Sequence, residues 1–364
     1  MSGCCGSDDV SPTPQGDDVH SWVQDYYGNI LKASADLQTN ACCATGAPPA
    51  RLAAALGHVH PDVLARFYGC GYPIPEVVEG ATVVDLGCGT GRDVFLLAQL
   101  VGPDGRVHGV DMTEEQLAVA RDTLAWHQER FGYAEGNVEL HQGFIEDLSF
   151  LADDSVDLIV SNCVVNLSPR KDLVLAEAFR VLKPGGSFYL SDVFCDRRLP
   201  PDVANDPLLH SECLGGAMYD FDFDQLARQV GFVDPRATER APITIQNAQI
   251  QAKAGAARFE SVTLRLFKLP ALEARCEDYG HVATYARPIP EVGALFALDE
   301  KHLFELGRPE RVCGNTAAML RETRFAPYFD VQGDRSTHFG AFDCSATTAA
   351  TTYATASAPG SSCC

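Results

Sequence analysis

The sequence predicts an α/β protein with a mainly parallel sheet, an antiparallel hairpin at one sheet edge and a smaller α+β domain after it. Strands and helices alternate between residues 81 and 195, and a glycine-rich turn directly follows the first strand. Two late strands lack a long helix between them, which favours the hairpin. At 364 residues, with 46% hydrophobic residues, the chain is long enough for two or three domains.

Each element follows from its local pattern. Strands are expected where short apolar runs end in turns, over residues 81–86, 106–111, 137–144, 155–162, 187–193, 236–245 and 259–269. Helices are expected where apolar residues recur with helical spacing, over residues 93–100, 113–131, 171–182 and 224–230. Thr113 is placed to cap the second of these helices, and residues 183–186 (KPGG) stop the third.

Composition shifts divide the chain into five parts. We expect a disordered tail over residues 1–20, a cysteine-bearing helical segment over 21–80 and the sheet domain over 81–269. A small domain over 270–345 and a flexible tail over 346–364 follow. Each tail carries adjacent cysteines, which we interpret as exposed thiols.

The charge balance excludes several partners. Lys and Arg total 28 against 49 Asp and Glu, a formal net charge of -21, so nucleic acid and anionic membranes are poor partners. No apolar run approaches the roughly 18 residues of a membrane span. The first ten residues lack the basic start and apolar stretch of a signal peptide, so we expect a cytosolic protein.

Cysteine is the unusual residue of this chain, with 14 copies. In a reducing compartment these thiols should not form permanent cross-links, so soft-metal or redox chemistry is the better interpretation. We expect about half of them to be small buried hydrophobic residues.

A cofactor loop follows the first strand, in the segment VDLGCGTG over residues 84–91. Asp85 precedes three glycines at alternate positions, Gly87, Gly89 and Gly91, which let the backbone approach a ligand closely. Twenty residues later the second strand ends in Asp111, where a carboxylate can accept hydrogen bonds from both hydroxyls of a ribose. The glycine loop, together with Asp111 at this distance, predicts a nucleoside cofactor.

An acid before the glycines suits a cationic amino group better than a phosphate. This order resembles the class I methyltransferases that use S-adenosyl-L-methionine, which implies their Rossmann-like sheet and makes residues 81–269 the methyltransferase domain. The resemblance places Ile145 and Glu146 at the adenine and Asn162 beside the methionine part of the cofactor. Met112 is also assigned to the cofactor, and Tyr68 either faces the sulfonium through its ring or is a core aromatic.

Four cysteines are expected to converge on the rim of this domain. Cys163 follows the fourth strand and Cys213 lies after the fifth, at the sheet edge where α/β sites form. Cys70 precedes the first strand, and Cys42 lies further upstream. Thiolates select soft, thiophilic centres.

Five segments carry a closer resemblance: SADLQTNAC, RFYGCG, SNCVVNL, ECLGGAMY and RFESVTLRLFKL. Together they are similar to arsenite methyltransferases of the eukaryotic and algal kind. The resemblance implies that Cys163 and Cys213 hold trivalent arsenic, and that Cys42 and Cys70 supply a further thiol and a redox-active disulfide. Cys43 is adjacent to Cys42, so the sequence leaves open which of the two thiols takes part in the reaction.

The implied activity is methyl transfer from S-adenosylmethionine to thiolate-bound arsenite or methylated trivalent arsenicals, with thioredoxin or glutathione as reductant and a monomeric enzyme. Two alternatives stay open: a thiol-rich arsenic or heavy-metal binding protein on this scaffold, and a quinone or lipid methyltransferase. Cys88 is expected only to fill the glycine loop. Four other cysteines have no convergent partner in this interpretation and are assigned to structure: Cys195, Cys276, Cys313 and Cys344.

Overall fold

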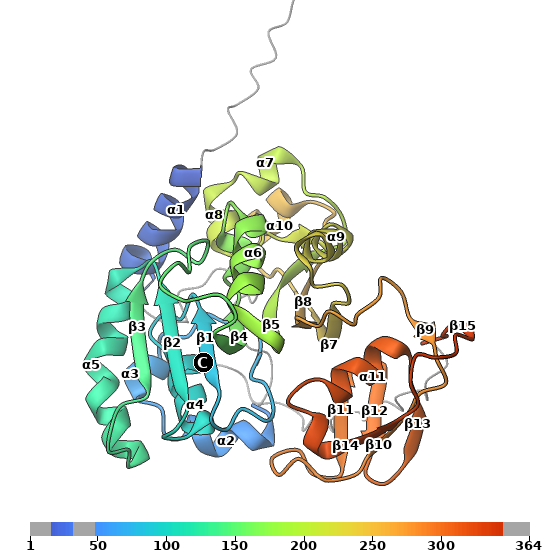
Figure 1. The fold of residues 1–364 in the computed structure, drawn as a ribbon. Helices are drawn as coiled ribbons and strands as arrows, with labels where there is room; N and C mark the ends of the chain where they lie inside the picture. The colour runs from blue at the N-terminus through green and yellow to red at the C-terminus, as the bar shows by residue number, and fades with distance from the viewer. Residues whose placement is uncertain (1–15, 32–47, 345–364) are drawn as a thin grey trace, which may run out of the picture.

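The computed structural model describes residues 16–31 and 48–344, which build one large sheet, its covering helices and a smaller C-terminal unit (Figure 1). The large sheet has eight strands in the order β3-β2-β1-β4-β5-β8-β7, with β6 paired to β5. Its strands are β1 Thr82–Leu86, β2 Arg106–Asp111, β3 Val138–Gln142, β4 Val156–Asn162, β5 Leu182–Cys195, β6 Met218–Tyr219, β7 Arg236–Pro242 and β8 Phe259–Phe267. The predicted α/β class is confirmed.

The strand order determines where a ligand can bind. β1 pairs in parallel with both β2 and β4, so the chain runs outward from β1 to β3 and then returns to the other side of β1. Such a reversal opens a crevice at the carboxyl ends of the strands. The predicted edge hairpin is also confirmed, because β8 pairs antiparallel with both β5 and β7.

Helices cover both faces of the sheet. Val83 and Leu158 pack with α4 (Arg92–Val101) and Leu117 of α5 (Glu114–Phe131) in one apolar cluster. The next residues along each strand, Val84 and Ile159, point to the opposite face. There they pack with α6 (Lys171–Val181) and α9 (Asp220–Val230).

Shorter helices occur before the sheet and beyond β5. In the N-terminal part these are α1 Gly16–Asp25, η1 Tyr26–Ile30, α2 Ala50–Leu56 and α3 Pro61–Leu64. Between and after the strands they are η3 Val165–Leu167, α7 Pro201–Ala204, α8 Pro207–Ser211 and α10 Ala248–Ala254.

Three local predictions differ from the structure. The expected tail over residues 1–20 is wrong from Gly16 onward, because α1 buries Val19 and Val23. α6 ends before residues 183–186, as expected, but β5 begins at Leu182 instead of Ser187, so these residues belong to the strand, where Gly185 has a φ of 86°. Thr113 is the N-cap of α5, but its side chain makes no cap hydrogen bond.

The C-terminal unit has its own aromatic core, which includes Tyr285, Phe296 and Phe329. Its elements are β9 Glu277–Asp278, β10 Val282–Tyr285, β11 Leu295–Asp299, β12 His302–Glu305, β13 Pro309–Arg311, α11 Gly314–Arg321, η4 Ala326–Tyr328, β14 Phe329–Gln332 and β15 Gly340–Ala341. Arg324 joins it to the main sheet by donating to Ser187 Oγ at 2.8 Å, near the start of β5. That attachment lies far along β5 from the strand ends that open the crevice.

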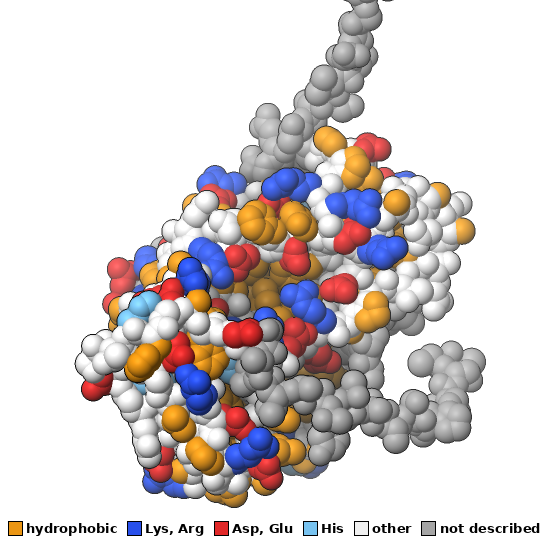
Figure 2. Space-filling view, turned by 90° about the vertical axis from the view of Figure 1, so that its right-hand side faces the viewer, with side chains coloured by type: hydrophobic (Ala, Val, Ile, Leu, Met, Phe, Trp, Pro, Cys, Tyr) orange, Lys and Arg blue, Asp and Glu red, His pale blue; other side chains and the backbone are white. Residues whose placement is uncertain are grey.

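The surface is polar and mixed in sign on the face that Figure 2 shows, where acidic and basic side chains lie interspersed. Ion pairs between surface side chains, such as Arg198 with Asp222 and Arg240 with Glu260, also occur in the described part of the chain. Within residues 16–31 and 48–344, no helix is both long and apolar enough to cross a membrane.

Candidate functional site

A cavity lies at the carboxyl ends of β1, β2 and β4, with about 910 Å³ of empty space of which part is open solvent. Nine of the ten residues predicted to bind a cofactor line it: Tyr68, Asp85, Gly87, Gly89, Asp111, Met112, Ile145, Glu146 and Asn162. The tenth, Gly91, has a different task. It begins α4 with a φ of 92°, and a Cβ there would lie 2.9 Å from Phe95 Cε2, so it sets the packing of the helix.

The glycine loop leaves no room for side chains at the cavity wall. A Cβ on Gly87, which has a φ of 69°, would lie 2.2 Å from Val164 Cγ2. Gly89 has a φ of 52°, and its N–H donates to Asp111 Oδ2 at 2.8 Å. The loop and the end of β2 are therefore locked together as one wall of the site.

Asp85 is a buried acid with unused hydrogen-bonding capacity. It is 2% exposed, and its Oδ2 has no hydrogen-bond partner among the described residues. Burial and the neighbouring Asp93 raise the pKa of Asp85 well above its usual range. A buried, unpaired carboxylate oxygen costs free energy unless a ligand satisfies it, and a cationic amino group would do so. This orphaned oxygen in a glycine-walled cavity fits a methionine-type cofactor.

Asp111 lies at the end of β2, as predicted. One carboxylate oxygen accepts from Gly89 N and the other from Thr113 N, both at 2.8 Å. Burial raises its pKa, and these two backbone N–H groups oppose the rise. Each oxygen keeps a second lone pair that can accept a ribose hydroxyl.

The N-terminal helix covers part of the cavity, which the sequence did not indicate. His20 on α1 lies 3.1 Å from Glu146 Oε1, and its ring stacks on Phe144 at a centroid distance of 4.5 Å. Tyr27 also lines the cavity, and its carbonyl accepts from Gln116 Nε2 at 2.7 Å. His20 and Gln116 carry no local motif, because tertiary packing alone brings them to the site.

Three of the four predicted cysteines meet at the rim. Cys163, directly after β4, lines the cavity, and its N–H donates to Ser191 O at 2.7 Å. Cys213 follows α8, and its thiol donates to Cys163 O at 3.4 Å. The Cys70 thiol hydrogen-bonds with that of Cys163, and all three cysteines belong to one buried cluster. Cys42, with its neighbour Cys43, lies outside the described residues.

Both predicted arsenic ligands have a strained backbone. Cys163 and Cys213 adopt φ values of 62° and 63°, in the left-handed region that favours glycine. Four non-glycine residues have a positive φ in the part of the chain that the structure describes, and these are two of them. Strain of this kind costs on the order of 1 kcal/mol per residue and clusters at functional sites, where it aims a side chain.

Asn162 has another role beside its place in the cavity wall. Its Oδ1 accepts from Cys70 N at 2.9 Å, and its Nδ2 donates to Gly71 O and Asp93 Oδ2, both also at 2.9 Å. These bonds hold the turn that carries Cys70 against the end of β4. Asn162 thus positions a cysteine of the rim, which its place in the sequence did not suggest.

Two buried ionisable groups lie behind the rim cysteines. Burial and the nearby Cys213 raise the pKa of Asp192 to about 7. Burial lowers the pKa of Lys171 to about 8, and its Nζ donates to Asn166 O at 3.0 Å and Ser168 O at 2.9 Å. Burial also raises the pKa of Cys70, and Asp192 adds to that rise.

The cysteines assigned to structure divide into two kinds. Cys88 is buried, lines the cavity and faces Gly109, while Cys195 is buried at the end of β5. The prediction that Cys276, Cys313 and Cys344 lack a convergent partner is wrong, because their three sulfurs lie within 4.8 Å of one another. They are far apart in the sequence, so no spacing motif indicated their meeting.

Comparisons with known proteins agree with this geometry. A family model described as a methyltransferase domain matches residues 78–231. An arsenite methyltransferase of Aquipseudomonas alcaligenes is 54% identical over 327 residues, which covers 89% of this chain and 94% of that protein. An arsenite methyltransferase of Mus musculus is 43% identical over 318 residues, 86% of this chain and 83% of that protein.

A solved structure is also similar. The crystal structure of CrArsM, titled an arsenic(III) S-adenosylmethionine methyltransferase from Chlamydomonas reinhardtii, has a TM-score of 0.79 and 49% sequence identity. The match covers 82% of this chain and all (100%) of that one.

Proposed function

We infer the function from the premise that this chain belongs to the arsenite methyltransferase family. It is an enzyme that transfers a methyl group from S-adenosylmethionine to trivalent arsenic. At the level of residues, one observation carries our proposal: Cys163 and Cys213, each in a left-handed backbone conformation, meet beside a cavity with an unpaired buried carboxylate.

The cavity residues would hold the cofactor in the following way. Asp85 would accept from the amino group, and Asp111 would accept from the ribose hydroxyls. Ile145 and Glu146 would flank the adenine, and Tyr68 would face the sulfonium with its ring. When bound, S-adenosylmethionine supplies an electrophilic methyl group.

Cys163 and Cys213 would hold arsenic as a thiolate complex, with Cys70 or Cys42 as the third sulfur for inorganic arsenite. Trivalent arsenic bound to sulfur keeps a lone pair, and that lone pair is the nucleophile. No general base is needed, since thiolate-bound arsenic carries no proton to remove. The protein then contributes mainly position and exclusion of water, which the fixed backbone of the two cysteines favours.

Methylation raises the formal oxidation state of arsenic by two. Two thiolates can return the two electrons by forming one disulfide, and we propose Cys42 and Cys70 for that step. Thioredoxin or glutathione would then reduce the disulfide by thiol exchange. A reaction that depends on reduced thiols suits the cytosol, and we expect the enzyme to work there as a monomer.

The test is methyl transfer from radiolabelled S-adenosylmethionine to arsenite in the presence of thiol, with the arsenic species separated and counted. We expect labelled methylarsenic from the unchanged chain and none from the Cys163→Ser, Cys213→Ser double variant. Cofactor binding without any methylated arsenic would contradict the proposal and favour a thiol-rich binding protein. A label that appears in a quinone or lipid would favour the other alternative.

A further inference from the structure

A second cluster of thiols lies outside the catalytic rim, in the C-terminal unit. Cys276, Cys313 and Cys344 bring their sulfurs within 4.8 Å of one another. None of the three lines the cavity. From the residue numbers, 37 and 31 positions separate them along the chain. A core that needed only small apolar residues would not require three distant segments to present sulfur at one point.

The fold assembles the cluster from three elements. Cys276 directly precedes β9, and its carbonyl accepts from Phe342 N at 2.9 Å. β15 pairs with β9, which brings the segment that carries Cys344 to Cys276, and the two sulfurs lie within 4.8 Å. Cys313 is the N-cap of α11, and its sulfur accepts from Thr316 N at 3.4 Å. The backbone pairing and the helix cap fix all three positions before any ligand arrives.

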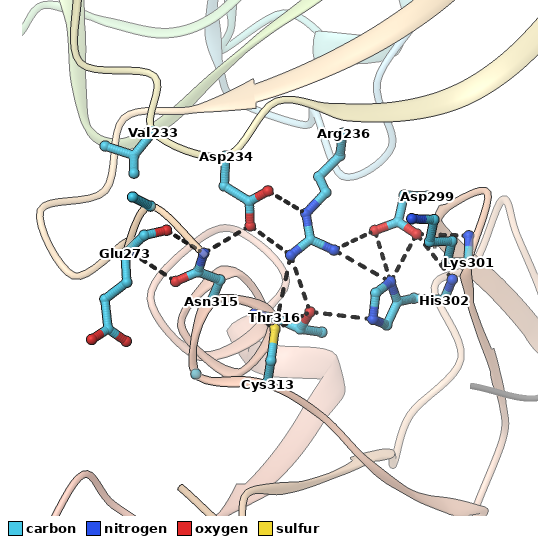
Figure 3. Close-up of polar contacts among 12 residues, drawn as sticks. Val233, Asp234, Arg236, Glu273, Asp299, Lys301, His302, Cys313, Asn315 and Thr316 are labelled. Atoms are coloured by element: carbon cyan, nitrogen blue, oxygen red, sulfur yellow. Dashed lines mark hydrogen bonds and ion pairs between the residues drawn. The ribbon is translucent and has the colours of Figure 1, made fainter. Parts of the chain in front are cut away.

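The charges around the cluster favour a thiolate at its buried member. Figure 3 shows the sulfur of Cys313 directed toward Arg236 of β7, whose Nη2 lies 3.9 Å away. Hydrogen bonds from Cys276 and Cys344, together with Arg236, hold the pKa of Cys313 well below its usual range. The pKa of Cys276 rises to about 11, so the donating partner keeps its proton.

The donor set is sulfur throughout. Within the described ranges, no imidazole nitrogen or carboxylate oxygen joins the three sulfurs within the same 4.8 Å. Cys313 is fully buried, while Cys276 and Cys344 are half-buried, so one side of the cluster faces outward. Soft thiolates select soft ions, and a structural zinc ion takes four ligands at about 2.3 Å.

The net charge of the bound complex distinguishes the two soft ions that could bind here, Zn²⁺ and trivalent arsenic. Three thiolates around Zn²⁺ leave a net charge of about −1, whereas three thiolates around trivalent arsenic leave a neutral complex. Arg236 could offset a negative complex, but Asp234 and Asp299 already hold it at 2.6 and 2.9 Å. The chain also carries a formal net charge of -21. A neutral three-coordinate complex with an outward lone pair therefore fits better.

We propose that Cys276, Cys313 and Cys344 form a second, non-catalytic binding site for inorganic trivalent arsenic, which joins β9, β15 and the start of α11. One arsenous acid molecule would exchange its three hydroxyl groups for three thiolates. Three As–S bonds form and three As–O bonds break. Three water molecules leave, two with the protons of Cys276 and Cys344 and one with a proton from solvent because Cys313 reacts as a thiolate, so no electron is transferred. Monomethylated arsenic offers only two such bonds, so the site discriminates between substrate and product.

The test measures arsenite binding without a methyl donor, so its result does not depend on the proposed methylation. The full chain carrying Cys163→Ser and Cys213→Ser is reduced with a phosphine, mixed with arsenite and freed of excess by gel filtration. Adding Cys313→Ser should lower the bound arsenic by about one atom per chain. Serine is a preferred N-cap residue, so α11 keeps its cap and the fold should survive.

Cys195→Ser in the same background is the matched control, since it removes a buried thiol outside the cluster and should leave the bound arsenic unchanged. Cys276→Ser, at a half-buried position, should lower the bound arsenic by the same amount as Cys313→Ser. X-ray absorption should report three sulfur neighbours, and monomethylated trivalent arsenic should bind at least about tenfold more weakly. Equal arsenic with and without Cys313→Ser would overturn the proposal. So would a bound zinc ion that arsenite cannot displace.

Discussion

The rim cysteines and the C-terminal cluster use the same ligand atom in opposite electrostatic surroundings. At the rim, the carboxyl group of Asp192 lies behind the thiols, and it adds to the raised pKa of Cys70. In the C-terminal unit, Arg236 and two hydrogen-bonding thiols lower the pKa of Cys313. The carboxyl group of Asp192 thus disfavours the thiolate form of Cys70, whereas Arg236 and the two neighbouring thiols favour the thiolate form of Cys313.

Backbone geometry differs between the two regions as well. Cys163 and Cys213 have φ values of 62° and 63°, whereas Cys313 has the extended conformation of a helix cap, with a φ of −71°. Backbone strain is found where the sulfurs of Cys163 and Cys213 must point toward the neighbouring cavity. It is absent at Cys313, where the sulfur caps the N-terminus of α11. Three nearby thiols alone therefore do not indicate a catalytic site. The adjacent cavity with an unpaired acid is what supports the catalytic role proposed for the rim.

The largest effect is expected at the rim. Cys163→Ser and Cys213→Ser should each lower methylation by about 100-fold or more, because a serine hydroxyl stays protonated at neutral pH and is a hard ligand. The measurement is methylated arsenic formed per minute at saturating S-adenosylmethionine. Cys195→Ser is the control and should retain most activity: Cys195 packs in the same apolar cluster, but its thiol donates to Asp196 at 3.8 Å. Equal losses in all three variants would show that any buried thiol matters equally.

The second prediction distinguishes the roles of Cys163 and Cys213 from those of Cys42 and Cys70, which come earlier in the chain. Inorganic arsenite takes three thiolates, and monomethylated arsenic takes two. Cys70→Ser, and a Cys42→Ser, Cys43→Ser double variant, should therefore fail on arsenite. They should still methylate monomethylated trivalent arsenic, since excess glutathione supplies the two electrons in place of the Cys42 and Cys70 thiols. Product speciation from each substrate under excess glutathione is the measurement. If both reactions fall equally, these cysteines act in every cycle and the count of ligands does not explain their role.

A smaller effect is expected at the cofactor end of the site. Asp111→Ala removes the ribose acceptor, and it also releases the N–H groups of Gly89 and Thr113. Cofactor affinity should fall by about 1–3 kcal/mol, roughly 5- to 150-fold, in calorimetry. Arsenite binding should stay unchanged at both thiol clusters. Unaltered cofactor affinity would place the ribose elsewhere.

The smallest effect is expected for Asp192, the buried acid behind the rim cysteines, and it concerns the pH dependence of stability. The folded pKa of Asp192, about 7, lies above its unfolded value, so the folded state holds the proton more tightly. Its contribution to stability is present at low pH and is lost as pH rises from about 4 to 7. Asp192→Asn should remove about 1 kcal/mol of this dependence, seen as Tm measured from pH 5 to 8.

Asp196 provides the control for that measurement. Arg197 lowers the pKa of Asp196 below its unfolded value, so its contribution to stability is lost only as pH falls below about 4. Asp196→Asn should therefore leave the pH dependence of Tm between pH 5 and 8 unchanged. The same slope in both variants would mean that the buried carboxyl of Asp192 does not carry the effect.

Local patterns were enough to predict the cofactor half of the site. A strand that ends in an acid, followed by alternate glycines, leaves few backbone solutions, and Asp111 follows at a fixed distance because one helix and one strand separate the two. The rim cysteines Cys163 and Cys213 were also predictable, since strand ends in a parallel sheet meet at one edge. Cys70 was placed correctly through its motif, while the bonds from Asn162 that hold it were not foreseen.

Tertiary structure alone decided the rest. His20 reaches Glu146 across 126 positions, and Cys276, Cys313 and Cys344 meet across three segments of the C-terminal unit. Short-range periodicity reports which residues share a strand or a helix face, so it fixed the sheet, its order of elements and its glycine loop. It carries no information on which distant segments pack together, because that depends on the burial of whole apolar faces and on strand pairing such as β9 with β15. The sequence therefore determined which residues line the proposed cofactor cavity, and the folded packing determined which thiols lie together.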